Sequence, residues 1–270
     1  MSTATHWLLL RGLAREQRHW HEFRELFAAR MTGASVHCVD VAGAGTEHVV
    51  LPRPSVSWMA RDVARRLPAL GGPPRPGERW GVVGLSLGGM LALELCRMFP
   101  LQIDAAVIIN GSSRLTSSSA RIRPAAAIQL LRAASLADPL RREKIVLALT
   151  SALPEAERTL YARRAAEFAR DAPPSRWAVV AQLLAASQFR PPPRSLVRAR
   201  LAFVCSRHDG LVSPRCTRDL AAWFGGTGEE HAWAGHDLAL DDPVWLCEHI
   251  AQVAGRSGTG LTNDAVTAHA

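Results

Sequence analysis

The 270-residue sequence lacks the features that would indicate a membrane-spanning or secreted protein. No apolar run approaches the roughly 18 residues that a membrane-spanning helix needs. Residues 1–5 carry no positive charge ahead of an apolar segment, so we expect no secretory signal peptide. The five cysteines are widely scattered, which without a secretion signal favours a reducing compartment. We therefore expect a soluble, cytoplasmic protein.

Lysine is almost absent: Lys144 is the only one, and the net charge of +8 comes from arginines spread along the chain. Such charge can attract nucleic acid, but no basic run is interleaved with aromatic stacking residues, and we expect no nucleic-acid partner. Residues 43–45 lack the third glycine of a dinucleotide-binding loop, and no phosphate-binding loop or zinc-spaced cysteine or histidine cluster occurs. The sequence therefore predicts no cofactor and no metal.

Short apolar runs that are typical of buried strands alternate along the chain with helical patterns. We predict strands at residues 7–10, 36–39, 80–85, 105–109 and 201–205, with a weaker sixth at 229–233. Helices are predicted at residues 17–31, 57–67, 90–99, 214–224 and 243–253. Two of them begin with a capping side chain before a proline, at Ser213-Pro214 and Asp242-Pro243. The alternation predicts an α/β fold with a mostly parallel sheet and helices on both faces.

One region breaks this alternation. Residues 114–198 show no strand signal, only helical patterns separated by prolines at 122–135, 139–152, 155–170 and 176–188. A helical insertion at the carboxyl edge of a parallel sheet lies where ligands bind. We therefore predict a core domain formed by residues 1–113 and 199–254, a helical cap formed by residues 114–198, and a flexible C-terminal tail at 255–270.

The segment Gly84-Leu85-Ser86-Leu87-Gly88 follows one predicted strand directly and opens a helix. This G-x-S-x-G pattern in a strand–turn–helix context is typical of a nucleophilic serine on a sharp turn. Glycines at positions 84 and 88 remove the Cβ atoms that would collide there. The helix N-terminus favours the negative charge that develops during acyl transfer. We predict that Ser86 is a nucleophile.

A serine hydroxyl needs a base, and the base needs an acid that orients it. Asp209 follows the predicted strand at 201–205, and His236 lies in the loop before the last helix. The order serine, aspartate, histidine is the one expected for such a fold. We therefore predict a triad of Ser86, Asp209 and His236.

Other residues compete less well for these roles. Asp237 adjoins His236 in the sequence, and a neighbouring residue rarely lies in the plane of the imidazole ring. His208 shares the loop of Asp209 instead of facing it. His19 and His21 are two residues apart on a predicted helix, so they should face different sides. Asn110 ends its strand but is not an acid.

Acyl transfer also needs hydrogen-bond donors for the oxyanion. One should be the backbone N–H of Leu87, directly after the nucleophile. The other should come from the turn after the first strand, Arg11-Gly12-Leu13, where we expect the N–H of Leu13. Gly12 would let this turn approach the site. Arg11 and Gly12 thus form a supporting loop.

These motifs together resemble the α/β-hydrolase superfamily, over residues 6–253. The turn from Asp40 to Gly45 resembles the family's Asp-x-Pro-Gly-x-Gly turn, with Ala42 replacing proline, and Gly235-His236 resembles its histidine loop. The capped layout is similar to small bacterial carboxylesterases, including the pimeloyl-carrier-protein methyl ester esterases. Where members commonly have His-Gly, this chain has Arg11-Gly12.

The interpretation that follows is a serine hydrolase cleaving a carboxylic ester of a small molecule, with activity rising through about pH 6–7 as His236 becomes neutral. Two alternatives stay open: a thioesterase or esterase acting on an acyl group held by an acidic carrier protein, and a non-catalytic binding protein. The carrier alternative depends on arginines of the predicted cap that could meet acidic helices. These are Arg121, Arg123, Arg132, Arg141, Arg142, Arg163 and Arg164.

Overall fold

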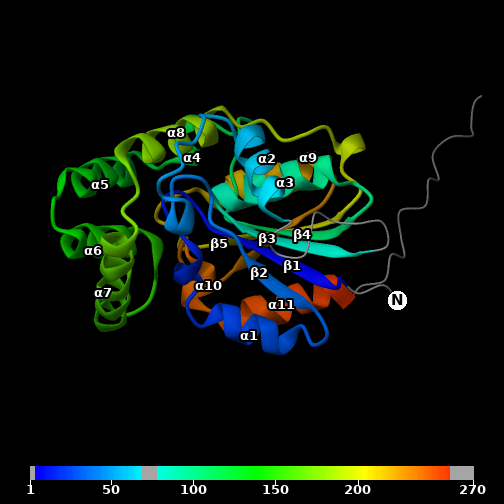
Figure 1. Ribbon diagram of the computed structural model, residues 1–270, viewed down its shortest axis with the longest axis horizontal. Coiled ribbons are helices and arrows are strands. Elements are labelled where there is room, and N and C mark those ends of the chain that lie inside the picture. The colour runs from blue at the N-terminus through cyan, green and yellow to red at the C-terminus, as the bar shows by residue number, and fades with distance from the viewer. Residues whose placement is uncertain (1–3, 68–77, 256–270) are drawn as a thin grey trace, which may run out of the picture.

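The computed structural model describes residues 4–67 and 78–255. Of the predicted C-terminal tail only Gly255 is described, so that prediction lies outside these ranges. Within them six strands form one sheet in the order β2-β1-β3-β4-β5-β6, and every neighbouring pair is parallel (Figure 1). The strands are β1 (His6–Leu10), β2 (Ser35–Cys38), β3 (Trp80–Leu85), β4 (Ile103–Ile109), β5 (Arg200–Ser206) and β6 (Gly228–His231).

The strand order reverses once. The chain steps from β1 outward to β2, returns to β3 on the other side of β1, and then continues outward to β6. Ligands of parallel α/β sheets bind beyond the carboxyl ends of the strands at such a switch point. The loops after β1 and β3 therefore flank the expected binding crevice.

Helices cover both faces of the sheet, because side chains along each strand point alternately to opposite sides. In β1, Trp7 and Leu9 join one apolar cluster, and Leu8 and Leu10 join the other. The first layer is formed by α1 (Phe23–Arg30) and α11 (Pro243–Gly255), and the second by α2 (Val56–Arg66), α3 (Leu87–Met98) and α9 (Pro214–Trp223) (Figure 1). This confirms the predicted α/β fold.

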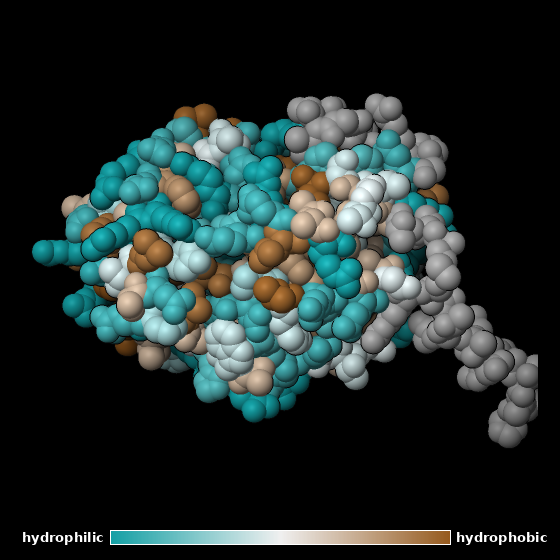
Figure 2. All heavy atoms as spheres, turned by 90° about the horizontal axis from the view of Figure 1, so that it is seen from below, coloured by the Kyte–Doolittle hydropathy of each residue, from teal (hydrophilic) through white to brown (hydrophobic). Residues whose placement is uncertain are grey.

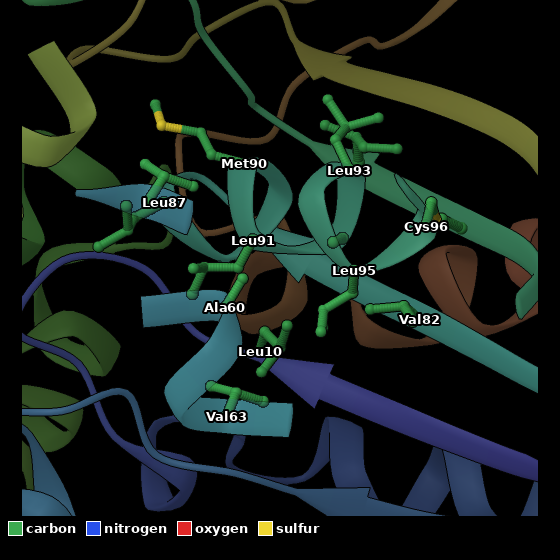
Figure 3. Close-up of a cluster of buried hydrophobic side chains, with 14 of the residues drawn as sticks. Leu10, Ala60, Val63, Val82, Leu87, Met90, Leu91, Leu93, Leu95 and Cys96 are labelled. Atoms are coloured by element: carbon green, nitrogen blue, oxygen red, sulfur yellow. The ribbon is translucent and has the colours of Figure 1, made fainter. Parts of the chain in front are cut away.

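Large side chains fill the second layer. Figure 3 shows Leu91 and Leu95 of α3 on the side of the helix that faces Leu10 of β1 and Ala60 of α2. Leu91 is fully buried. The predicted capping side chains are also in place, since Ser213 accepts a hydrogen bond from the N–H of Arg215 and Asp242 accepts one from Trp245.

The segment between β4 and β5 is helical, as predicted, and lies beyond the carboxyl ends of the strands (Figure 1). We call residues 114–198 the helical insertion. A four-residue helix, α4, was not expected, and neither was α10 (Leu238–Asp241) after the histidine loop. The helices of the insertion are α4 (Ser118–Arg121), α5 (Pro124–Ser135), α6 (Pro139–Thr150), α7 (Glu155–Asp171) and α8 (Arg176–Gln188).

The predicted helix at residues 17–31 is wrong in one respect. A 3₁₀ turn, η1 (Gln17–Trp20), is separated from α1 by a break at His21, whose φ is +46°. The break turns the rings of His19 and His21 toward Phe168 of α7, at centroid distances of 5.2 and 6.2 Å. The two rings are 6.1 Å apart, so they do not face different sides as expected. Contacts with the insertion thus outweigh the local preference for a continuous helix.

Candidate active site

Ser86 occupies a strained turn between β3 and α3. Its φ of +58° and ψ of −115° lie in a region that non-glycine residues rarely adopt. The neighbouring glycines make the turn possible: a Cβ atom on Gly84 would overlap the carbonyl oxygen of Gly88, and one on Gly88 would overlap that of Leu10. The turn is fixed to the sheet by a 2.8 Å hydrogen bond from the N–H of Ser86 to the carbonyl of Ile109.

The structure brings the side chains of Asp209 and His236 together. The imidazole Nδ1–H donates to Oδ2 of Asp209 at 2.7 Å, and both residues are at most 5% exposed. The other carboxylate oxygen, Oδ1, accepts hydrogen bonds from the N–H groups of Leu211 and Val212, each at 2.8 Å. The carboxylate is therefore held from both sides, with one oxygen reserved for the imidazole.

The end of β4 holds both the serine turn and the histidine loop. Asn110, with a φ of +49°, directly follows Ile109, whose carbonyl accepts the N–H of Ser86. Its side-chain amide donates to the carbonyl of His236 at 2.8 Å and accepts the N–H of Ser206 at 2.8 Å. Two adjacent residues thus fix Ser86 and His236. The described residues show no hydrogen bond between the Ser86 hydroxyl and His236; such bonds are often long before substrate binds.

Two backbone donors remain free beside the serine. Within the described ranges, the N–H groups of Leu13 and Leu87 have no hydrogen-bond acceptor. Leu87 begins α3, where an unpaired N–H is usual. Gly12 lies so close to the serine that a Cβ atom there would be 3.2 Å from the Cβ of Ser86. Arg11, Gly12 and Leu13 therefore lie against the turn that carries the serine.

Arg11 has a defined partner. Its guanidinium donates two hydrogen bonds to the carboxylate of Asp237, at 3.0 and 2.5 Å, and also lies over the ring of Trp20. Arg11 and Asp237 are 3% and 6% exposed. This buried pair joins the loop after β1 to the residue next to His236. Asp237 is thus engaged by Arg11, and the acid that contacts the imidazole is Asp209.

The insertion reaches the same loops through Gln182 of α8, which is 1% exposed. Its Oε1 accepts the N–H of Ala14 at 2.8 Å, and its Nε2 donates to the carbonyl of Ala42 at 2.9 Å. Ala14 follows the free N–H of Leu13 and has a φ of +54°. A single amide from the insertion therefore fixes the loops after β1 and β2.

A second contact between the insertion and the site is made by Asp241. Its carboxylate accepts hydrogen bonds from the hydroxyl of Ser151, the N–H of Ala152 and the N–H of Gly235. The N–H of Asp237 in turn donates to the carbonyl of Thr150, at the end of α6. Burial raises the pKa of Asp241 above its ordinary value of 3.8. The histidine loop is thus anchored on both the sheet and the insertion.

The charges around His236 act on its proton affinity in opposite directions. Burial lowers the pKa of the imidazole, but the charge of Asp209 and the hydrogen bond to it outweigh burial, so that the pKa lies above 6.5. For Asp237, burial raises the pKa, and Arg11 outweighs it, so that the carboxyl pKa lies below 3.8. Asp237 therefore stays ionised beside the imidazole.

Of the supporting residues, Gln182 and Asp241 belong to no motif that would single them out in the sequence. Asn110 is an amide, so the search for an acid does not select it. Its position could have indicated a role, because Asn110 directly follows a predicted strand, at the same carboxyl edge of the sheet as Ser86 and Asp209. For Gln182 no local pattern existed, because its partners are 168 and 140 residues away.

The described part of the chain contains neither a metal-binding cluster nor a membrane-spanning helix. No group of three or more His, Cys, Asp or Glu side chains there could hold a metal ion. No helix in those ranges is long and apolar enough to cross a membrane. All five cysteines are free thiols, and burial raises the pKa of Cys96 to about 12. The serine turn is thus the nucleophile candidate with organised neighbours.

Comparison with known proteins places the chain beside hydrolases. A family model described as the alpha/beta hydrolase family matches residues 7–249. None of the curated protein sequences compared with the chain matches it.

Many solved structures are similar in fold. An esterase from Rhodococcus sp. ECU1013 has a TM-score of 0.72 at 17% identity, covering 94% of this chain and 92% of that chain. An enol-lactonase from Burkholderia xenovorans LB400 has a TM-score of 0.71 at 18% identity, with 93% and 92% covered. A thermophilic esterase from Thermogutta terrifontis has a TM-score of 0.68 at 19% identity, with 93% and 90% covered.

Proposed function

The chain belongs to the α/β-hydrolase family, and on that premise we propose that it is a serine hydrolase that cleaves a carboxylic ester of a small molecule through Ser86, His236 and Asp209. The observation that carries the proposal is the buried 2.7 Å hydrogen bond between Asp209 and His236, anchored through Asn110 to the turn that strains Ser86. A structural serine would need neither the strain nor the oriented imidazole.

In the proposed reaction, Nε2 of His236 takes the proton of the Ser86 hydroxyl as its oxygen attacks the ester carbonyl carbon. Asp209 keeps the proton on Nδ1, so that Nε2 is the basic nitrogen, and stabilises the imidazolium that forms. The imidazolium then gives its proton to the departing alcohol as the carbon–oxygen bond breaks. Water releases the acyl group by the same steps, with His236 again as base.

The free N–H groups of Leu13 and Leu87 would donate to the oxyanion of each tetrahedral intermediate. Gly12 supports this role because it lets the loop after β1 approach the Cβ of Ser86. We assign Arg11 a positioning role. Its pair with Asp237 holds the loop of Leu13 and the loop of His236 at a fixed separation.

We further propose that residues 114–198 act as a cap over a core of residues 1–113 and 199–254. Gln182 and Asp241 support this division, since they connect the insertion to three loops of the site.

The carrier-protein alternative is weakened, because four of its seven arginines already have partners within this chain. Of the arginines expected to be available to an acidic carrier, Arg121 is instead buried against carbonyls of α8. Three others already lie near acids of this chain: Arg141 near Asp138, Arg142 near Glu143 and Arg164 near Glu22.

The test of the proposal is Ser86→Ala. We expect it to lower the turnover of p-nitrophenyl esters by about 10³-fold or more, because alanine has no oxygen that could attack the carbonyl carbon and form the acyl-enzyme. A fluorophosphonate probe should label the native chain at Ser86 and leave the variant unlabelled. A matched control is Ser112→Ala, a buried serine after β4. Wild-type-like hydrolysis by the Ser86 variant would refute the proposal, and an unlabelled native chain would favour the binding-protein alternative.

The pH profile tests the roles of His236 and Asp209. Because His236 must be neutral to accept a proton, activity should fall as pH decreases through the pKa of its imidazole. This pKa is raised above 6.5, so the fall should lie toward or above the upper end of the pH 6–7 range expected from the sequence. Asp209→Asn removes the charge that raises this pKa, so any residual activity should persist to lower pH. A profile unchanged in that variant would contradict the assignment of Asp209.

A further inference from the structure

Two helices of the insertion, α5 and α8, turn large apolar side chains toward solvent. Their buried faces carry alanines, Ala126 and Ala133 in α5 and Ala178, Ala181 and Ala185 in α8. This is the reverse of an ordinary amphipathic helix, which buries its large apolar residues. The exposed residues, which we call the α5–α8 apolar surface, are Ile128 (66% exposed), Leu131 (73%), Trp177 (48%), Val180 (46%), Leu183 (41%) and Leu184 (41%).

The charge of the chain is concentrated around the same helices. Residues 114–198 contain 15 of the 32 basic and six of the 24 acidic side chains, which gives +9 against −1 for the rest of the chain. All six acids lie between residues 138 and 171, five of them on α6 and α7 and the sixth, Asp138, directly before α6. The flanking stretches at 114–137 and 172–198, which include α5 and α8, hold eight arginines and no acid.

Several of these arginines are available for a partner. Arg123 and Arg132 of the α5 region and Arg176 and Arg190 of the α8 region are exposed, and none has an ion pair within the described part of the chain. The two helices are connected locally. The guanidinium of Arg121, three residues before α5 begins, donates to carbonyls near the end of α8. Figure 1 shows α5 at the outer end of the insertion and α8 nearer to α2.

A partner that binds this surface must match both its exposed apolar side chains and its positive charge. A second copy of the chain docking through the same surface would bring arginines against arginines, which is unfavourable. A lipid leaflet offers anionic phosphate groups and hydrocarbon within about 5–10 Å of each other. Tryptophan is also favoured at that boundary. Figure 2 shows a different side of the molecule, seen from below. The hydrophobic patches on that side are small and are separated by hydrophilic residues.

We propose that the α5–α8 apolar surface, with Arg123, Arg132, Arg176 and Arg190, docks the protein on an anionic lipid surface. The arginines contact the phosphates, and the apolar side chains enter the headgroup–acyl boundary without spanning it. Each arginine near an anionic leaflet strengthens binding by roughly fivefold. The proposal is independent of whether Ser86 is catalytic.

The test is cosedimentation of the full chain, as its Ser86→Ala variant, with vesicles of phosphatidylcholine alone or mixed with phosphatidylglycerol. We expect binding to the mixed vesicles to be at least about tenfold tighter, and to weaken as salt is raised. The combined variant Leu131→Ser, Trp177→Ser, Leu184→Ser should weaken binding about tenfold or more. Its control, Leu101→Ser with Val244→Ser, changes side chains that are 65% and 54% exposed elsewhere and should bind normally.

A second pair of variants isolates the charge. Arg176→Gln with Arg190→Gln should reduce the preference for phosphatidylglycerol, whereas Arg215→Gln with Arg218→Gln, on α9, should not. Near-native circular dichroism of each variant shows that it is folded. Equal binding by surface and control variants, or no binding to either vesicle, would overturn the proposal. If the native chain did not bind vesicles but sedimented as a dimer, and only the surface variant were monomeric, the surface would instead bind a second copy of the chain.

Discussion

The sheet with its covering helices and the helical insertion are stabilised in different ways. The helices of the sheet layers bury leucines, methionines and aromatic rings, such as Leu91 and Phe27, in two large clusters. The buried positions of the insertion are mainly alanines, and its own apolar cluster consists of Leu147, Ala162 and the neighbouring Leu240. Since apolar burial contributes stability in proportion to area, the insertion gains less from packing than the sheet does.

Polar contacts replace apolar packing where the insertion meets the rest of the chain. Gln182 and Asp241 make buried hydrogen bonds between the two regions, and a largely buried ion pair joins Arg15 to Glu143. More exposed ion pairs connect α7 to the region of η1 and α1. Such contacts are directional, and each contributes little on its own. The insertion is therefore connected to the rest of the chain mainly by separate polar contacts, whereas the sheet layers share large apolar clusters.

The largest difference between the two regions should appear in the free energy of unfolding when one leucine in each region is replaced by alanine. Leu91→Ala in α3 should lower the free energy of unfolding by about 2–5 kcal/mol, because it leaves a cavity among fully buried neighbours. Leu131→Ala in α5, 73% exposed, should change it by no more than about 0.5 kcal/mol. Urea denaturation of both variants measures this. Similar losses in the two would mean that α5 is packed against something in solution.

A smaller effect is expected from the amide that connects the regions. Gln182→Ala leaves the N–H of Ala14 and the carbonyl of Ala42 without partners, at a cost of about 1–3 kcal/mol in unfolding free energy. Because Ala14 follows Leu13, we also expect kcat to fall more than KM changes.

Gln182→Glu sharpens this prediction, since burial favours the protonated carboxyl group, which keeps the acceptor for Ala14 and can still donate to the carbonyl of Ala42. It should recover most of kcat. Gln188→Ala, an exposed glutamine that ends α8, is the control and should leave both constants unchanged. A rise in KM alone, or no rescue by glutamate, would argue against a link to the oxyanion loop.

The same contrast explains how far the sequence could predict this molecule. Strands such as residues 80–85 and 105–109 were predicted from local apolar runs, because burial on both faces leaves a continuous pattern in the sequence. Ser86, with its glycines, and the paired Asp209 and His236 followed from motif and chain order. The alternating pattern also predicted that helices would cover both faces of the sheet.

What could not be predicted depended on contacts between distant segments. The break at His21 has a local signature too weak to compete with a helical pattern, and it arises where Phe168 of α7 packs against η1. The role of Arg11 became visible only through Asp237, 226 residues away. The apolar residues of α5 and α8 recur in the sequence at ordinary helical spacing. This spacing predicts a helix but does not show which of its faces is buried.

The smallest change in the free energy of unfolding should come from removing an exposed ion pair between the two regions. Glu22 contacts Arg164 at 2.8 Å, with the two side chains 52% and 43% exposed, and also accepts a hydrogen bond from Tyr161. Glu22→Gln removes the charge but can still accept from Tyr161, so the free energy of unfolding should fall by at most about 1 kcal/mol. Hydrogen exchange should show slightly faster opening of α7 amides and no change in α3.

The control is Glu230→Gln, which removes the charge of a β6 residue that pairs with Arg207 and Arg218, away from the insertion. It should leave α7 unaffected. High salt should reduce the difference between native chain and Glu22 variant, because exposed pairs are screened. If Glu22→Gln instead destabilised α3 as much as α7, the two regions would unfold as one unit, and the contrast between a packed scaffold and a tethered insertion would be wrong.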